Sequence, residues 1–308
     1  MAQSLAPEGG RWFRGDGDPE AMLRAAAEQA KKPFVPKVLP NEAAVGAFQL
    51  AALREVAAAK PQEEAVSLAL LGGRGAQNCY GLLRELAEAG DPLIKRLDVY
   101  CQDAMVPMSK DSSLTFVRDF ERQLGPAFFG SIRNFFPVDS EAEDLEEATR
   151  RQLATLPEDG IDLMFMGHGP EEGDNAHVAY IRAGSSAGIA DVAGLVAVSA
   201  VTLEHHVDKF KAGGAVISAE DEAECREKSH TIWTIGPATI LKAKRAVQSV
   251  VDASTATAKK RTYRKVLETD MAVDDLPALQ RQLQENPGLY ARCHPNVVSL
   301  ILPDVLGD

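Results

Sequence analysis

The segment Ile161–Ser186, IDLMFMGHGPEEGDNAHVAYIRAGSS, decides the fold prediction. Its apolar run, Leu163 to Met166, is followed at once by Gly167 and by an acidic, glycine-containing loop that leads to His177. A short apolar run that ends at glycine is typical of a buried strand, so the loop leaves the carboxyl end of that strand. Because ligands of open α/β sheets bind at this edge, we expect His177 in a functional site. The alternative is a structural histidine in a tight loop.

A second strand and loop precede this segment. Val66 to Leu71 is apolar apart from Ser67, and Gly72, Gly73 and Gly75 follow it before a run of leucines with helical spacing. The backbone N–H groups of such a loop can bind a phosphate, and Arg74 within it would add a positive charge. The same glycines could equally serve only the turn from strand to helix.

Asp103 directly follows a third predicted strand, Leu97 to Cys101. A carboxylate at that place either caps the next segment or moves a proton. Further helices are predicted over 41–60, 112–124, 141–156, 238–251 and 274–284, and further strands over 230–235 and 297–302, with only turns between 186 and 200. This alternation predicts an α/β fold, with a doubly wound, mostly parallel sheet flanked by helices.

The first 37 residues differ in composition from the rest of the chain. They contain many Gly and Pro residues and one predicted helix, and the prolines at 33, 36 and 40 impose an extended path. We therefore predict an N-terminal arm and linker over 1–37 and a single large α/β domain over 38–308. The arm's aromatic residues, Trp12, Phe13 and Phe34, could pack on this domain or on another subunit, so a homo-oligomer remains open.

Composition excludes several classes of function. The chain has 308 residues and a formal net charge of -12, which argues against nucleic acid as a partner. It shows neither a signal-peptide pattern nor about 18 consecutive apolar residues, so we expect a cytoplasmic protein without a membrane span. Its four cysteines lack CxxC spacing, and the adjacent His205 and His206 lack the spacing of a chelating pair. We expect no metal and no cofactor.

Five segments, in the same order, resemble the glucosamine-6-phosphate deaminase and 6-phosphogluconolactonase family. They are LALLGGRGAQNCYGLLRELA (68–87), DVYCQDAMVP (98–107), GHGPEEGDNAHVAYIRAGSS (167–186), HTIWTIGPATILKAKRAV (230–247) and CHPNVVSLILPDVL (293–306). The resemblance covers about Val38 to Leu306. It implies a Rossmann-like fold, a phosphorylated sugar or amino sugar as the ligand, and a phosphate loop that includes Gly73 and Gly75.

The resemblance also suggests roles for single residues. Asp103 matches the carboxylate that moves a proton between C1 and C2 in the deaminases, and His177 matches the histidine associated with ring opening. Asp174 lies one position from the family's aspartate before that histidine, and Arg182 stands where the family has a glutamate. Lys242 is the nearest substitute for the lysine of the TGxxKA element, which would make it a phosphate ligand.

The leading functional hypothesis is an enzyme that resembles glucosamine-6-phosphate deaminase but has altered catalytic residues. It would perform an aldose–ketose isomerisation, with or without release of ammonia. A lactone hydrolase similar to 6-phosphogluconolactonase is the alternative, since His177 could activate water beside Arg182. The departures from the family pattern at Ala104, Asn175 and Arg182 keep a third possibility open, a catalytically inactive sugar-phosphate sensor.

Overall fold

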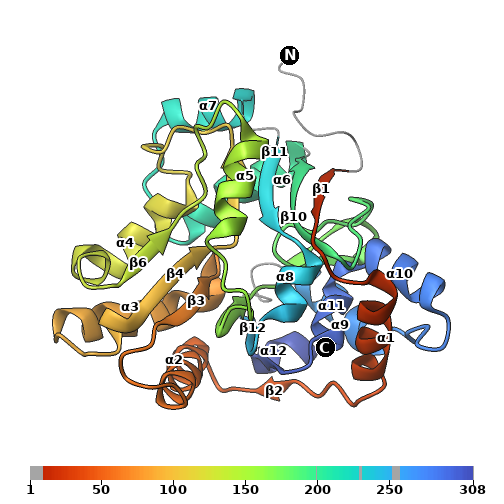
Figure 1. Ribbon diagram of the computed structural model, residues 1–308. Coiled ribbons are helices and arrows are strands. Elements are labelled where there is room, and N and C mark those ends of the chain that lie inside the picture. The colour runs from red at the N-terminus through yellow and green to blue at the C-terminus, as the bar shows by residue number, and fades with distance from the viewer. Residues whose placement is uncertain (1–9, 199, 229–230, 252–256, 308) are drawn as a thin grey trace.

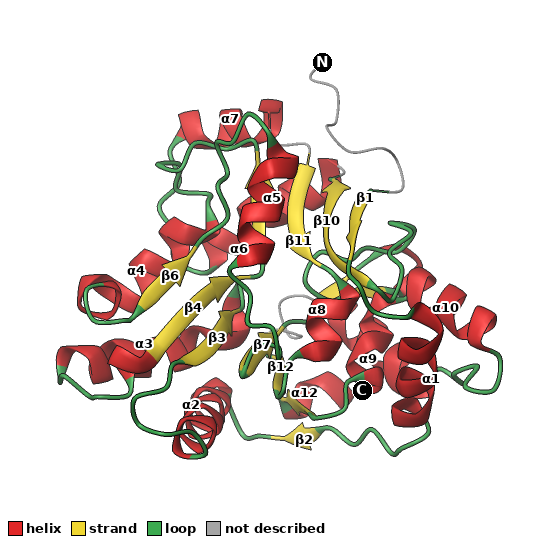
Figure 2. Ribbon diagram, in the orientation of Figure 1, coloured by secondary structure: helices red, strands yellow, loops and turns green. Residues whose placement is uncertain are grey.

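The computed structural model describes residues 10–198, 200–228, 231–251 and 257–307. A seven-stranded sheet forms its centre, in the order β2-β13-β12-β7-β3-β4-β6, and all of its strand pairs are parallel (Figures 1 and 2). Its strands are β2 (Lys37–Val38), β3 (Val66–Leu70), β4 (Leu97–Cys101), β6 (Asn134–Phe136), β7 (Leu163–Met166), β12 (Ala246–Val250) and β13 (Val297–Ile301). The predicted α/β fold with a mostly parallel sheet is confirmed.

Side chains that alternate along the strands build a separate core on each face of this sheet. In β7, Leu163 and Phe165 belong to one core, whereas Met164 and Met166 belong to the other. The first core is completed by α2 (Glu42–Ala58), α3 (Gln77–Glu88) and α4 (Phe116–Phe129). The second is completed by α1 (Pro19–Ala30), α8 (Pro237–Lys242), α10 (Leu276–Glu285) and α11 (Tyr290–Cys293). Burial on both faces explains why β7 is apolar throughout.

A second, antiparallel sheet lies beside the first, in the order β1-β10-β11-β5. It consists of β1 (Arg11–Arg14), β10 (Asp191–Ala197), β11 (Thr231–Ile235) and β5 (Asp103–Val106). The chain passes from β4 into β5 at Gln102, whose side-chain amide donates to the carbonyls of Leu70 and Phe165 at 2.7 and 2.6 Å. Gln102 therefore ties the ends of β3 and β7 together, and Asp103 lies where the two sheets meet.

The remaining helices of the described part connect and cover these sheets. They are α5 (Leu145–Ala154), α6 (Ala200–Ala212), α7 (Ala219–Lys228), α9 (Ala258–Glu268) and α12 (Pro303–Leu306). A short hairpin follows β7, formed by β8 (Gly169–Pro170) and β9 (Ala176–His177). None of the helices that the structure describes has the length and apolar character needed to cross a bilayer.

Two sequence-based predictions of secondary structure are wrong. The helix expected over 238–251 is the short α8 followed by strand β12, which lies between β7 and β13 with all five residues buried. The turns expected between 186 and 200 contain strand β10, whose Gly194 lies against the ring of Trp12. Packing against neighbouring strands determines the conformation of both segments, and the local sequence says little about which neighbours a segment will have. His230, the first residue of the strand predicted over 230–235, lies outside the described residues.

The aromatic residues of the N-terminal arm pack on the body of the same chain. Strand β1 pairs with β10, and Trp12 donates its indole N–H to the carbonyl of Ser185 at 2.6 Å. Trp12, Phe13 and Phe34 all contact the core that α1 helps to form. The arm thus contributes a strand to the second sheet and side chains to the second core.

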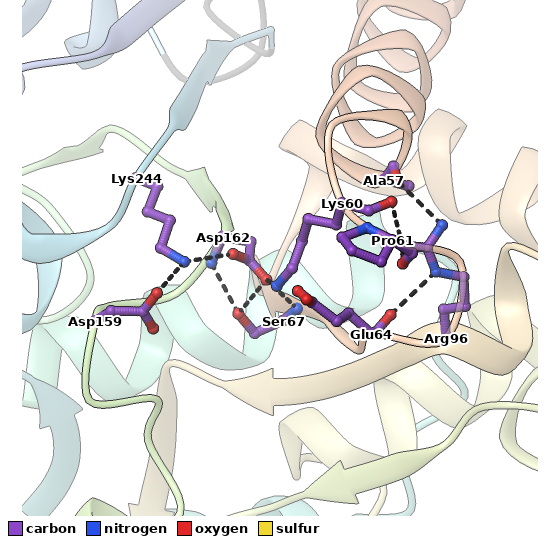
Figure 3. A network of polar contacts seen from close by, with 9 residues as sticks. All are labelled: Ala57, Lys60, Pro61, Glu64, Ser67, Arg96, Asp159, Asp162 and Lys244. Atoms are coloured by element: carbon purple, nitrogen blue, oxygen red, sulfur yellow. Dashed lines mark hydrogen bonds and ion pairs between the residues drawn. The ribbon is translucent and has the colours of Figure 1, made fainter.

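A buried carboxylate connects the amino ends of β3 and β7 (Figure 3). Asp162, whose side chain is 4% exposed, accepts from Lys60 Nζ at 2.7 Å and from Lys244 Nζ at 2.9 Å. It also accepts from the backbone N–H and the hydroxyl of Ser67 in β3. Two cations and two further donors therefore hold one carboxylate, which joins both strands to the segment before β12.

Candidate functional site

A cavity of about 510 Å³ opens at the carboxyl ends of β3, β4, β7 and β12. Its walls come from the glycine loop after β3, the first residue of β5, the hairpin after β7, helix α6 and the start of α9. Six of the nine residues predicted from the sequence line it: Gly72, Gly73, Arg74, Gly75, Asp103 and His177.

The glycine loop has a conformation that only glycine adopts readily. Gly73 has φ 91° and ψ -165°, and a Cβ there would meet only the stem of Lys209, at 3.7 Å or more. The carbonyl of Gly75 accepts from Gln49 and from Ser249 of β12, which anchors the loop to the neighbouring elements. Arg74 also lines the cavity, but it pairs with Glu42 at 2.9 Å, so part of its charge is already compensated.

The hairpin after β7 presents His177. Its ring lies directly against Gly169, where a Cβ would come within 1.8 Å of Nε2, so glycine is required for this position of the ring. His177 Nδ1 lies 2.7 Å from Glu171 Oε1, and the ring stacks on Tyr180 with the centroids 5.3 Å apart. With Nδ1 occupied by the carboxylate, Nε2 is the nitrogen that can exchange a proton with a ligand.

Glu171 is a residue of the candidate site that the sequence analysis missed. It is the first acid of the PEEGDN loop, and its side chain is 10% exposed. Its other oxygen lies 3.8 Å from Arg182 Nε. Arg182 therefore acts on the carboxylate that holds His177, and it is not among the residues that line the cavity. Only the register of the β8–β9 hairpin shows which of the loop's acids reaches the histidine.

Asp103 is a second buried carboxylate of the site, 7% exposed. Burial raises its pKa to about 7, against the opposing effects of a hydrogen bond from Thr234 and the positive charge of Lys209. The Thr234 hydroxyl donates to Asp103 Oδ1 at 2.6 Å. Both protonation states of Asp103 are therefore accessible near neutral pH, which is what reversible proton transfer requires.

Two lysines line the cavity that the sequence analysis did not propose. Lys209 of α6 donates from Nζ to the hydroxyl of Tyr180 at 2.9 Å, and Lys259 lies at the start of α9. Helical spacing could have found Lys209, because it follows the buried His206 by three residues and so shares its side of the helix. Lys259 could not be placed without the strand β12 that precedes it.

The other predicted site residues lie outside this cavity. Asp174 is half exposed and accepts from Arg261 Nε at 2.9 Å. Lys242 lines a different, mostly apolar cavity of about 670 Å³, and its carbonyl lies beside Gly160 at the amino end of β7. Among the residues that the structure describes, no group of three or more His, Cys, Asp or Glu could hold a metal ion.

Two kinds of sugar-phosphate enzyme are among the solved structures with the same fold. A monomeric glucosamine-6-phosphate deaminase aligns with a TM-score of 0.60 at 19% identity, over 88% of this chain and 98% of its own. The 6-phosphogluconolactonase from Trypanosoma cruzi aligns with a TM-score of 0.60 at 15% identity, over 89% and 97%. The 6-phosphogluconolactonase from Trypanosoma brucei aligns with a TM-score of 0.59 at 18% identity, over 89% of this chain and 97% of its own.

The chain therefore has the fold of the sugar-phosphate deaminases and lactonases. This confirms, at the level of the fold, the resemblance that the five sequence segments carry. Its sequence matches no family model and no curated protein. Identities of 15 to 19% describe a divergent chain, so the reaction has to be argued from its own side chains.

Proposed function

We propose that the protein is an enzyme of sugar-phosphate metabolism that isomerises a phosphorylated aldose or amino sugar, with or without release of ammonia. The observation that carries this proposal is Asp103, a buried carboxylate with a pKa of about 7 in the same cavity as a carboxylate-bound histidine and a glycine loop. A base of this pKa is half ionised near neutral pH, where it can take a proton from carbon and return it.

Each part of the reaction has a group in the cavity. Ionised Asp103 would take the proton from the carbon beside the carbonyl and return it to the neighbouring carbon. His177, held by Glu171, would exchange the proton of the ring oxygen when the sugar ring opens.

Phosphate binding is assigned to the backbone of Gly72–Gly75 together with Lys209 and Lys259. The conformation at Gly73 leaves open space in front of the loop, and the stem of Lys209 borders that space. Lysine ammonium groups and loop N–H groups are the donors that bind phosphate in proteins. Lys242 has no part in this assignment, because it lines the other cavity.

Lactone hydrolysis is the second candidate, and the pair of His177 with Glu171 favours it. A histidine whose Nδ1 is held by a carboxylate can accept a proton from water at Nε2, as in other hydrolases. Lys209 would then stabilise the developing oxyanion. This reaction leaves no role for the near-neutral pKa of Asp103, which is why isomerisation ranks first.

A panel of phosphorylated sugars, amino sugars and sugar lactones tests the proposal, measured by turnover and by thermal shift on the wild type, Asp103→Asn and His177→Ala. We expect one phosphosugar to raise the melting temperature of all three proteins and to be converted only by the wild type. Equal turnover by His177→Ala would remove His177 from the mechanism. Stabilisation of the wild type without turnover of any compound would show a sensor instead.

A further inference from the structure

Thr234 lies opposite Asp103 in the second sheet. The two residues are direct partners in the antiparallel pair of β11 and β5, which places their side chains on the same face of that sheet. Thr234 is 0% exposed. A buried hydroxyl at this point either completes a hydrogen-bond network or leaves polar groups unsatisfied at a cost in stability.

Three polar contacts surround the Thr234 hydroxyl. It donates to Asp103 Oδ1 at 2.6 Å, accepts from the backbone N–H of Tyr180 at 3.0 Å, and has the carbonyl of Ile235 as an alternative acceptor at 3.2 Å. A threonine hydroxyl has one proton to donate and two lone pairs that accept. It can therefore serve one acceptor at a time while it receives two donors.

We propose that Thr234 is a positioning residue that keeps Asp103 hydrogen-bonded in both of its protonation states. When Asp103 is ionised, the Thr234 hydroxyl donates to it. When Asp103 carries the proton, the carboxyl O–H donates to Thr234 Oγ1, and the hydroxyl of Thr234 turns to the carbonyl of Ile235. The N–H of Tyr180 stays bonded throughout, so neither this N–H nor the carboxyl group of Asp103 loses its partner when the proton moves.

The inference deepens the proposed function and rests on Asp103 as the base. Isomerisation requires this carboxylate to accept a proton and give it back in each turnover, so both states have to be stable in the buried site. The Thr234 hydroxyl also accepts from the backbone N–H of Tyr180, three residues after His177. It thereby holds the backbone of the residue whose ring stacks on His177.

Other groups facing Asp103 set the background against which Thr234 acts. Lys209 of α6 favours the ionised form by its charge. Burial raises the pKa of the Cys101 thiol on β4 and of the Tyr180 hydroxyl, so both are neutral when Asp103 titrates. Thr234 alone among these groups contacts the carboxylate through a hydroxyl that can donate or accept.

Direct titration of Asp103 by carboxyl ¹³C NMR tests the inference on the full chain and needs no substrate. The proteins are the wild type, Thr234→Val, Thr234→Ser and the control Thr239→Val. Thr239 is also a buried threonine, but it donates to the carbonyl of Val192 and lines the other cavity. Deuterium exchange into a bound phosphosugar, followed against pH, gives the functional readout.

Loss of a donor to the ionised form raises a carboxyl pKa, so Thr234→Val should move the Asp103 midpoint up by about one pH unit. Thr234→Ser should restore the wild-type midpoint, and Thr239→Val should not change it. An unchanged midpoint in Thr234→Val, or a shift that Thr234→Ser fails to restore, would overturn the inference. If the midpoints shift as expected while no protein exchanges deuterium, the proposed function fails and the positioning role stands.

Discussion

Glu171, which lies beside His177, and Asp103, which lines the cavity, differ in their partners, and we propose different tasks for them. Glu171 lies against His177 and near Arg182, so its neighbours are groups that can carry a positive charge. Asp103 has a hydroxyl at hydrogen-bond distance and a lysine nearby, and burial dominates its pKa. When the surroundings of two carboxylates differ in this way, one carboxylate can orient a neighbouring side chain while the other exchanges protons.

Replacement of the orienting carboxylate tests this distinction. Glu171→Gln keeps the size of the side chain but removes the charge that holds the Nδ1 proton of His177. We expect kcat to fall about 100-fold, the scale of one positioned acid–base group. Asp174→Asn is the matched control, because it removes an acid from the same loop that pairs with Arg261 outside the cavity. Steady-state kinetics that show an equal loss in both variants would contradict the assignment of Glu171.

At the scale of elements, the site is assembled where strand ends of the parallel sheet meet helix α6. The strands supply the glycine loop, Asp103 and the histidine hairpin, whereas α6 brings a cation to them. Lys209 of this helix contacts both parts of the site. Its positive charge lowers the pKa of Asp103, and its Nζ donates to the hydroxyl of Tyr180, whose ring stacks on His177. A change on α6 should therefore alter both ligand binding and the titration of the base.

Lys209→Met should weaken phosphosugar binding and shift the pH dependence of turnover. In the proposed mechanism the ionised form of Asp103 is the active base, so we expect the rate to rise with pH through a pKa of about 7. Lys209 favours that ionised form, and its loss raises the pKa, which moves the rising limb to higher pH. Lys211→Met is the control, since Lys211 pairs with Glu222 on the surface. A pH–rate profile of Lys209→Met that superimposes on the wild type would refute this coupling.

At the amino ends of β3 and β7, the buried carboxylate of Asp162 holds the two strands together (Figure 3). Burial alone would raise its pKa, but hydrogen bonds from Lys60, Ser67 and Lys244 outweigh it and lower the pKa below the usual value. Asp162→Asn should destabilise the fold by about 3 kcal/mol, because two lysines lose a buried partner. Asp159→Asn should cost less than about 1 kcal/mol, since its exposed carboxylate shares only Lys244.

The contribution of Asp162 also has a defined pH dependence. A carboxylate whose pKa is lower in the folded state stabilises the protein above its unfolded pKa, about 3.9, and loses this effect as the pH falls. The difference in the free energy of unfolding between the wild type and Asp162→Asn should therefore become smaller in acid. Chemical denaturation at pH 7 and near pH 3 measures it, and a gap that widens in acid would contradict the assignment.

At the scale of the whole molecule, the sequence predicts the elements whose signals are local. Apolar runs that end at glycine or at a polar residue identify β3, β4 and β7, and they place Asp103 and His177 at strand ends. Strands β10 and β12 escaped prediction because small residues and a mixed sequence became buried only through their neighbours.

The partners of the predicted site residues could not be found in the same way. Glu171 reaches His177 through the register of the hairpin formed by the short strands β8 and β9. Thr234 reaches Asp103 through the pairing of β11 with β5. Lys209 arrives on a helix more than 100 positions beyond Asp103 in the sequence. Such contacts depend on tertiary structure, whereas the strand-end positions of Asp103 and His177 follow from the local pattern.

Deuterium incorporation measures the central claim most directly, because proton transfer to and from carbon by Asp103 exchanges substrate hydrogen with solvent. The wild type and Asp103→Asn are incubated in D₂O with the phosphosugar that stabilises them, and proton NMR follows the carbon beside the carbonyl. We predict deuterium at that carbon with the wild type and none above background with Asp103→Asn. Equal incorporation by both proteins, or none by a wild type that binds the sugar, would contradict the account.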